Sequence, residues 1–463
     1  MTQLFGTIVC IACIAGLFVL DRDAGVRPSK ALWIPTLWLL INGSRAVSAW
    51  LHMDSAESLA RQYSEGSPLD AAIYGILIGA GLLALNFRAS RVRGFLRENL
   101  PLLLFLLYCA LSIMWSEYSF IAFKRWSKSV GDVVMVMLVL TDPYPPFAIK
   151  RVFARVAFVL LPLSVLFIQC YPALGTAFNP EDNAMMYSGV TTFKNMLGMT
   201  SMVFGLSSAW SFIGYFEERN NPLRRRHLIA HGAVAGIALW LIVKADSMTS
   251  LSCFFLAGSV MVLISWRWVT RWQVSLHLIF CSAIAVPLFA LFLNTMGTLV
   301  HFLGRNTTLT GRTTIWKAVL SVHTNPFLGA GFESFWLGSR LQAVWNMSVK
   351  GIQEAHNGFI EIYLNLGWIG LLLLGCLIVT GYRKAVTAFR SDPQDGRLRL
   401  AFLVAALIFS LTEAGFRMLT PIWFAFLLSV TGVPSCLRVE ERRGKPVLAR
   451  EQAAHPRPIR ILQ

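Results

Sequence analysis

Long apolar segments recur along nearly the whole chain and constrain its fold more than any other feature. Of the 463 residues, 56% are hydrophobic and only 14% are charged, whereas soluble domains average about 25% charged residues. About 20 apolar residues span a bilayer as a helix, and a helix is the open structure that satisfies its own backbone hydrogen bonds in lipid. The sequence therefore predicts an all-α, polytopic membrane protein.

Thirteen apolar segments are candidate membrane helices, so we expect a bundle of about 12–13 transmembrane helices. They lie near 4–20, 31–51, 71–87, 99–115, 129–142, 152–171, 196–216, 228–246, 250–266, 274–296, 367–382, 400–416 and 418–436. They divide the chain into N-terminal transmembrane helices, one long loop, C-terminal transmembrane helices and a basic tail that we expect to be disordered. The corresponding bounds are 1–296, 297–366, 367–436 and 437–463.

The net charge of +17 arises from basic residues in short loops, so it predicts membrane topology rather than binding to nucleic acid. Alternate loops carry 27 and 11 Lys and Arg residues. Because Lys and Arg accumulate on the cytoplasmic side, we expect the C-terminal tail to be cytoplasmic. The loop 297–366 then lies on the outer side and contains short helices. This topology requires the short segment 129–142 to cross the membrane.

The long loop holds an arginine in a pattern typical of anion-binding helix ends. Thr310 precedes an amphipathic run, and we expect it to cap a helix with Arg312 in the first turn. Helix N-termini favour anions, and a guanidinium can bind phosphate through two hydrogen bonds. Arg305 could converge on the same anion. The alternative is an ordinary polar cap with a solvated arginine, and spacing alone favours neither.

His356 begins the run HNGFIEIYLNLGWIG, which enters the next apolar segment. If the run is one helix, Tyr363 shares a face with His356, and Asn357 and Glu361 form a pair on a neighbouring face. A histidine just above the membrane can take a proton from a hydroxyl near neutral pH. A lone histidine more often has a structural role. For the glycine-rich turn Pro326–Gly331 we favour a structural role.

Other charged residues lie on the predicted outer side, where basic residues are scarce. Lys124, Arg125 and Lys128 either attract an anionic substrate or belong to an interfacial amphipathic helix. Lys194 begins a predicted span, and Glu413 lies near the outer end of another. Charges at membrane depth are costly, so they are functional candidates.

The sequence lacks the motifs of several reaction classes. It has no P-loop GxxxxGK[ST], no HExxH, and no DxD-like acidic pair in the predicted outer loops for a divalent metal. We therefore expect no metal and no cofactor. An activated substrate on the outer side would be lipid-linked, because nucleotide sugars are not supplied there.

Three motifs follow one another in the loop: GRTTIW at 311–316, NPFLGAGFESF at 325–335 and HNGFIEIYLNLGWIG at 356–370. In this order they resemble the O-antigen ligase and polymerase superfamily, whose long periplasmic loop carries such elements between many membrane helices. TTFKN at 191–195 and the LTE that ends at Glu413 resemble the exopolysaccharide-polymerising branch of that superfamily.

The resemblance implies metal-independent glycosyl transfer at the periplasmic face of the bacterial inner membrane, from a glycan carried on undecaprenyl pyrophosphate. It implies that Arg312, with Arg305, holds the pyrophosphate and that His356 deprotonates or orients the acceptor hydroxyl. Lys194 or Arg125 is the candidate for a further cation. The expected supporting residues are Asn357, Glu361 and Glu413. Expected partners are membrane lipids and other polysaccharide-export or chain-length proteins.

Alternatives to a polymerase of lipid-linked repeat units stay open. The chain could be a ligase that transfers a finished glycan to lipid A–core, a transporter or flippase of lipid-linked saccharide, or a non-catalytic scaffold. The candidate groups gather in the outer loop rather than near the bilayer midplane, where transporters bind their substrates. This placement favours an enzyme.

Overall fold

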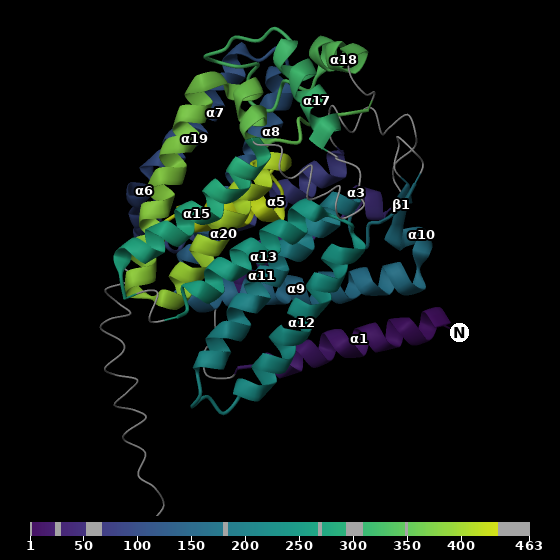
Figure 1. Cartoon of the computed structure of the whole chain (residues 1–463), viewed down its shortest axis with the longest axis vertical. Helices are drawn as coiled ribbons and strands as arrows, with labels where there is room; N and C mark the ends of the chain where they lie inside the picture. The colour runs from purple at the N-terminus through teal and green to yellow at the C-terminus, as the bar shows by residue number, and fades with distance from the viewer. Residues whose placement is uncertain are drawn as a thin grey trace, which may run out of the picture.

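The computed structural model describes residues 2–23, 29–51, 67–178, 184–266, 271–292, 309–347 and 351–433. These residues form a helical bundle with one short antiparallel sheet (Figure 1). The elements before the long loop are α1 (Thr2–Leu20), η1 (Lys30–Leu32), α2 (Trp33–Asn42), α3 (Val47–Trp50), α5 (Pro68–Asn86), α6 (Ala89–Glu98), α7 (Leu100–Leu111), η2 (Ser112–Trp115), α8 (Ser119–Leu140), α9 (Pro145–Cys170), α10 (Pro172–Gly175), β1 (Thr176–Phe178), β2 (Met185–Tyr187), α11 (Lys194–Glu217), α12 (Arg224–Lys244), α13 (Met248–Leu263) and α15 (Gln273–Phe292). The loop and the C-terminal part contain α17 (Leu309–Ser321), α18 (Gly338–Met347), α19 (Gly358–Ser391), α20 (Pro393–Thr412) and α21 (Pro421–Val430).

The predicted polytopic helical bundle is confirmed, and each of the thirteen apolar segments falls on a helix or on a broken pair of helices. Within the described ranges, six helices are long and apolar enough to cross a membrane, namely α1, α5, α9, α11, α12 and α19. The pair formed by α6 and the α7–η2 segment, bent by 84°, counts as a seventh if it is one crossing. This is fewer than the 12–13 we expected. Hydropathy does not show where an apolar segment breaks, as 31–51 does between α2 and α3.

The segment 129–142 is not a separate short helix but the second half of α8, which is 22 residues long. Every residue from Gly131 to Leu140 is buried, whereas the first half of the helix carries Lys124, Arg125 and Lys128. The basic stretch and the apolar stretch are therefore one continuous helix.

The hairpin of α20 and α21 forms the centre of the bundle (Figure 1). Every residue from Asp395 to Ser410 in α20 is buried, and so are all ten residues of α21. Both helices are therefore enclosed by protein, and α8, α11, α13, α15 and α19 pack around this hairpin. By contrast, α1 lies along the outside of the bundle.

The long loop is folded around a small hydrophobic core of its own. This core contains Ile315, Val319, Ala330, Phe335, Val344, Ala355 and Leu364. Its helices α17 and α18 lie at one end of the bundle, at the top of Figure 1, and we call this the loop end. Residues 297–308 of the predicted loop and the predicted tail 437–463 lie outside the described residues.

Helix α19 is interrupted at Gly367, which has a φ of 64° and a ψ of −164°. The turn Pro326–Gly331 docks on this break. The N–H of Trp368 donates to the carbonyl of Pro326, and the N–H of Ala330 donates to the carbonyl of Leu364, both at 2.9 Å. These bonds satisfy backbone groups that the interruption would leave unpaired. The glycine-rich turn is thus a docking element that fixes the N-terminal part of α19.

Candidate functional site

The carboxylate of Glu413, at the C-terminal end of α20, joins three segments that are far apart in the sequence. Its Oε1 accepts hydrogen bonds from Nη2 of Arg312 at 2.6 Å and from Nδ2 of Asn195 at 3.2 Å. Its Oε2 lies 3.1 Å from Nδ1 of His356. The Glu413 side chain is only 6% exposed, against 20% for Arg312 and 27% for His356. Two residues predicted from separate motifs therefore meet at one buried carboxylate.

Four helices begin around this carboxylate. The first two are α11 and α17, whose first turns contain Asn195 and Arg312, the two side chains that donate hydrogen bonds to Glu413. The third is α19, whose cap residue Asn357 donates from Nδ2 to the carbonyl of Leu411 at 3.0 Å. The fourth is α13. The hydroxyl of Thr249, in its first turn, lies 3.0 Å from that of Thr412, the residue before Glu413. Helix N-termini carry unpaired N–H groups and the positive end of the helix dipole, so their meeting favours an anion here.

His356 lies in a turn rather than in a helix. Its φ of +47° is in the left-handed region, which few non-glycine residues adopt and which is over-represented at functional sites. The side chain of Asn357 caps α19 by accepting hydrogen bonds from the N–H groups of Phe359 and Ile360. The helix therefore starts at Gly358, and the expectation that His356 and Tyr363 share a helical face is wrong.

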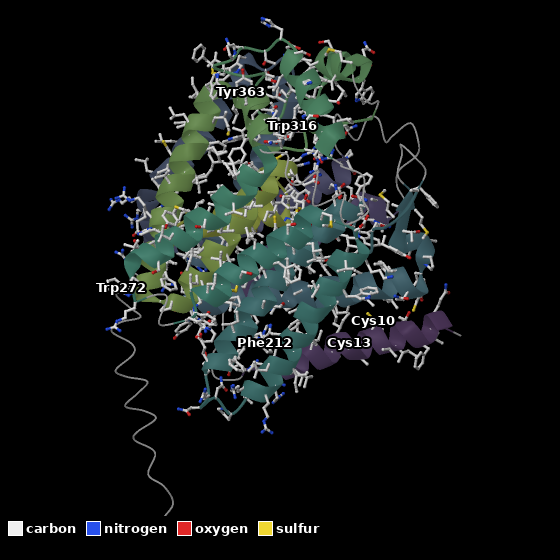
Figure 2. All side chains as sticks on the ribbon, viewed as in Figure 1. Cys10, Cys13, Phe212, Trp272, Trp316 and Tyr363 are labelled. Atoms are coloured by element: carbon white, nitrogen blue, oxygen red, sulfur yellow. The ribbon has the colours of Figure 1, made fainter. Side chains whose placement is uncertain are left out.

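Two tryptophans and a glutamate fix this turn. Nε1 of Trp316 donates to the carbonyl of Ala355 at 2.8 Å, and the N–H of Ala355 donates to the carboxylate of Glu361. Nε1 of Trp336 donates to both Glu361 oxygens, at 2.9 and 3.1 Å. Trp316 lies at the loop end (Figure 2) and is four residues after Arg312 on α17. One face of α17 therefore holds both the carboxylate and the histidine turn.

Two charged residues that the sequence did not single out complete the cluster. Oε1 of Glu354 lies 3.1 Å from Nδ1 of His356, and its Oε2 lies 3.4 Å from Nη1 of Arg417. Burial lowers the pKa of His356, but hydrogen bonds and charges from Glu354 and Glu413 outweigh burial and raise this pKa to about 10. In this arrangement His356 is an imidazolium at neutral pH. It can act as a base only after it loses that proton, so its predicted role as a base stays a prediction.

Three site residues that the sequence analysis did not select all lie within a few positions of a residue that it did select. Glu354 comes two residues before His356, Arg417 comes four residues after Glu413, and Asn195 follows Lys194 in TTFKN. Hydropathy and motif spacing gave no reason to select them individually.

The other predicted cations lie beside the cluster or outside the described residues. Nζ of Lys194 is 3.8 Å from a carboxylate oxygen of Asp246. Arg125 donates from Nη1 to the backbone carbonyl of Glu333. Arg305 falls outside the described residues.

Thr310 does not cap the helix that carries Arg312. Helix α17 begins at Leu309, so Thr310 lies inside it and Arg312 is its fourth residue. The placement of Arg312 near a helix N-terminus is correct, but the predicted cap is wrong.

A pocket lies next to the cluster and shares Glu354 and Arg417 with it. Aromatic side chains of Trp336, Phe416 and Trp423 line much of the remaining wall. Ligand pockets are typically apolar with a few charged groups that orient the ligand. This pocket combines apolar ring faces with charges at one side.

The fold defines a polytopic helical membrane protein, and its loop carries Arg312, Glu354 and His356 of the charged cluster. Residues 233–375 match the family model described as O-antigen ligase, and this segment contains Arg312 and His356 but not Glu413. The chain is also 24% identical, over 400 residues, to the exopolysaccharide production protein ExoQ of Rhizobium meliloti. That alignment covers 84% of this chain and 87% of the relative. These matches confirm the resemblance drawn from the motifs.

Proposed function

We propose that this protein is a polysaccharide polymerase that joins lipid-linked repeat units at the periplasmic face of the inner membrane. The donor is a glycan on undecaprenyl pyrophosphate. The observation that carries the proposal is the convergence of Arg312, Asn195 and His356 on Glu413, where four helices begin.

The charges of the cluster suit a pyrophosphate leaving group. Three cations, Arg312, His356 and Arg417, are paired with two carboxylates, Glu354 and Glu413, which leaves one net positive charge before substrate binds. Arg312 and Arg417 are the two that keep their charge when His356 acts as the base. Negative charge grows on the pyrophosphate as its bond to the sugar breaks, and fixed cations stabilise that charge most in the transition state. In the proposed complex, pyrophosphate oxygens replace the glutamate carboxylate on Arg312.

The acceptor is a sugar hydroxyl, which is a weak nucleophile and needs a base. Its oxygen attacks the anomeric carbon of the donor sugar, the bond from that carbon to the pyrophosphate oxygen breaks, and the hydroxyl proton passes to the base. We assign the base to His356 in its neutral form. That form becomes accessible when substrate binding separates the imidazole from Glu354 and Glu413, because these carboxylates hold its pKa at about 10.

The pocket beside the cluster supports a glycan substrate. Trp336, Phe416 and Trp423 line it next to Glu354 and Arg417. Because Phe416 and Trp423 are almost fully buried, a sugar ring enters only if this lining moves on binding. A sugar ring held there would lie close to the cations that receive the leaving group. Holding two reactants in position accounts for a large share of many enzymatic rate enhancements.

A ligase is the second candidate, and the family match at 233–375 supports it. The relative that aligns along most of the chain is an exopolysaccharide production protein, which favours the polymerase. A transporter or flippase has less support, because the clustered cations lie at the loop end of the bundle rather than along a path through it.

The test uses the full-length protein reconstituted in lipid vesicles with undecaprenyl-pyrophosphate oligosaccharide, with and without a lipid A–core acceptor. We expect longer glycans and released undecaprenyl pyrophosphate from the donor alone. Product that forms only when lipid A–core is present would replace the polymerase by the ligase. Movement of the donor across the bilayer without bond formation would replace the enzyme by a transporter.

A further inference from the structure

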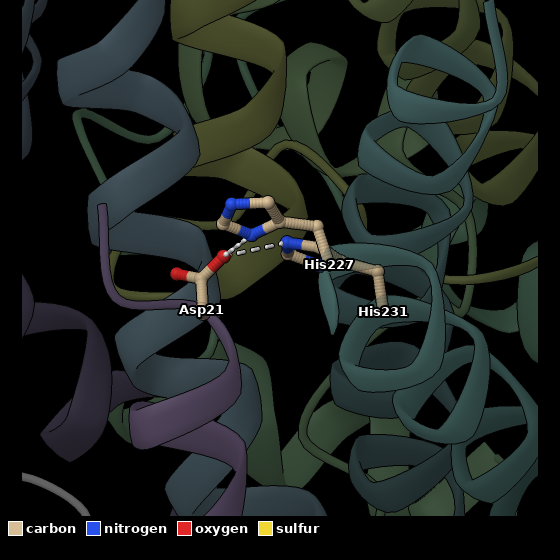
Figure 3. A group of neighbouring side chains, drawn as sticks. All are labelled: Asp21, His227 and His231. Carbon is tan, nitrogen blue, oxygen red and sulfur yellow. Dashed lines mark hydrogen bonds and ion pairs between the residues drawn. The ribbon is translucent and has the colours of Figure 1, made fainter. Parts of the chain in front are cut away.

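A second cluster of ionisable side chains lies away from the loop end, where α1 meets α12 (Figure 3). Oδ1 of Asp21 is 3.2 Å from Nδ1 of His227 and 3.1 Å from Nε2 of His231. All three side chains are buried, with exposures of 7% for Asp21 and 1% for each histidine. The two histidines are four residues apart on α12, so they share one face of the helix.

Neighbouring side chains hold the three groups in orientation. The ring of Tyr215 stacks on that of His227 with a centroid distance of 4.1 Å and an interplanar angle of 5°. Nη1 of Arg151 on α9 lies 3.4 Å from Oδ2 of Asp21. Because Arg151 engages Oδ2, Oδ1 is left to face both imidazoles. Metal-binding carboxylates are commonly held in this way by a hydrogen bond on the second oxygen.

One ring nitrogen of each histidine faces Asp21, and the other faces away from it. Nε2 of His227 and Nδ1 of His231 are buried and have no hydrogen-bond partner among the described residues. Neutral imidazole is the form that binds metal ions.

We propose that Asp21, His227 and His231 form a zinc-binding site that links α1 to α12. Two histidines at i and i+4 with one carboxylate are a common zinc ligand set. The ligand atoms lie within 4.8 Å of one another. Ligands at about 2.0–2.1 Å from a tetrahedral zinc ion are roughly 3.3 Å apart, which is close to the two N···O separations found here.

The site is expected to bind more weakly than a closed structural zinc site. On binding, the proton of each imidazole moves from the liganding nitrogen to the outer nitrogen, which lacks an acceptor. Arg151 also places positive charge beside the ion, and so does Lys150, whose Nζ lies 3.8 Å from the centroid of the Tyr215 ring. The ion would nevertheless hold α1, most of which lies exposed along the outside of the bundle, to α12.

The test measures metal binding by the full-length protein in detergent after treatment with a chelator. Zn²⁺ titration by calorimetry gives the stoichiometry, and Co²⁺ gives the visible absorption of a tetrahedral site with nitrogen and oxygen ligands. We expect one Zn²⁺ per chain in the wild type. We expect at least roughly 100-fold weaker binding in His231→Gln, in which the amide can still donate to Asp21 but the imidazole ligand is gone.

Two control variants separate this site from others on the chain. His277→Gln removes an exposed histidine on α15. His356→Gln removes the histidine from the other group that could hold a metal, Glu354, His356 and Glu413. We expect both controls to bind Zn²⁺ as the wild type does. A wild type that binds no Zn²⁺ would overturn the proposal, and so would binding that survives His231→Gln or disappears in His356→Gln.

Discussion

Arg312 and His356 lie 44 positions apart in the sequence and bind the two oxygens of one carboxylate. Nη2 of Arg312 is 2.6 Å from Oε1 of Glu413, and Nδ1 of His356 is 3.1 Å from Oε2. The shared carboxylate keeps both cations in position before any substrate is present. In the proposed reaction this carboxylate gives up Arg312 to the pyrophosphate and releases His356, which then acts as the base.

The imidazole of His356 should be required for turnover but not for folding. We expect His356→Ala to lower the polymerisation rate by roughly 100-fold or more, as removal of a general base commonly does. Elongation of undecaprenyl-pyrophosphate oligosaccharide in vesicles measures the rate, and size-exclusion chromatography checks the fold. His323→Ala, in the same loop, is the matched control and should retain activity. Full activity in His356→Ala would remove this residue from the mechanism.

Replacement of Arg312 by lysine keeps a positive charge but removes the forked guanidinium. A lysine cannot reproduce a planar pair of donors. Its single ammonium group would also hold the Glu413 carboxylate less firmly than the guanidinium does. We expect Arg312→Lys to lower kcat/KM by roughly 10- to 100-fold. Lys317→Arg, on the same helix, is the control and should change little. Near-normal kcat/KM in Arg312→Lys would argue against pyrophosphate binding at this position.

The pairing of His356 with two carboxylates should make stability depend on pH. The pKa of this imidazole is about 10 in the folded chain against an ordinary value of 6.5. The folded state therefore binds the proton more tightly, so its stabilisation is complete below about pH 6.5 and is lost as the pH rises through about 10. We expect the apparent Tm of the wild type to fall more steeply over this window than that of His356→Gln. Parallel curves for the two proteins would contradict the pairing.

The indole N–H of Trp316 should affect the reaction rate, because it holds the turn that contains His356 in position. Trp316→Phe keeps an aromatic ring but removes the donor that binds the carbonyl of Ala355 at 2.8 Å. We expect kcat to fall by roughly 10-fold, since small displacements of a catalytic group are costly, with a small change in KM. Trp126→Phe removes a similar bond to Leu106 elsewhere and serves as the control. Equal kcat values for both variants would show that the turn does not depend on this bond.

The break in α19 should tolerate no side chain at Gly367. A Cβ there would lie 2.2 Å from the carbonyl oxygen of Phe327, at a φ of +64°. We expect Gly367→Ala to lower the apparent Tm strongly and to reduce the yield of monodisperse protein, because the clash adds to backbone strain of about 1–3 kcal/mol. Gly375→Ala is the matched control on the same helix, since its Cβ meets nothing within 4 Å. A wild-type Tm in Gly367→Ala would contradict the docking of the turn.

Much of the site could be predicted from local sequence. Arg312 near a helix N-terminus, His356 beside an apolar helix and a folded loop with short helices all follow from nearby residues, because caps, turns and hydropathy depend on local sequence. The chain path that joins them could not be predicted. Glu413 was selected only as a charge near a span end, and Glu354 was not selected at all. Their importance comes from contacts between distant segments.

By itself, the sequence determined that the chain is a helical membrane protein, where its helices fall and which loop contains Arg312 and His356. These are consequences of hydrophobic burial and backbone hydrogen bonding, which act residue by residue along the chain. Only the tertiary structure decided that Glu413 binds both Arg312 and His356, that His356 lies in a left-handed turn, and that α20 and α21 form the centre of the bundle. Those features depend on which helices pack together, and packing between distant segments is not encoded in any single stretch of the chain.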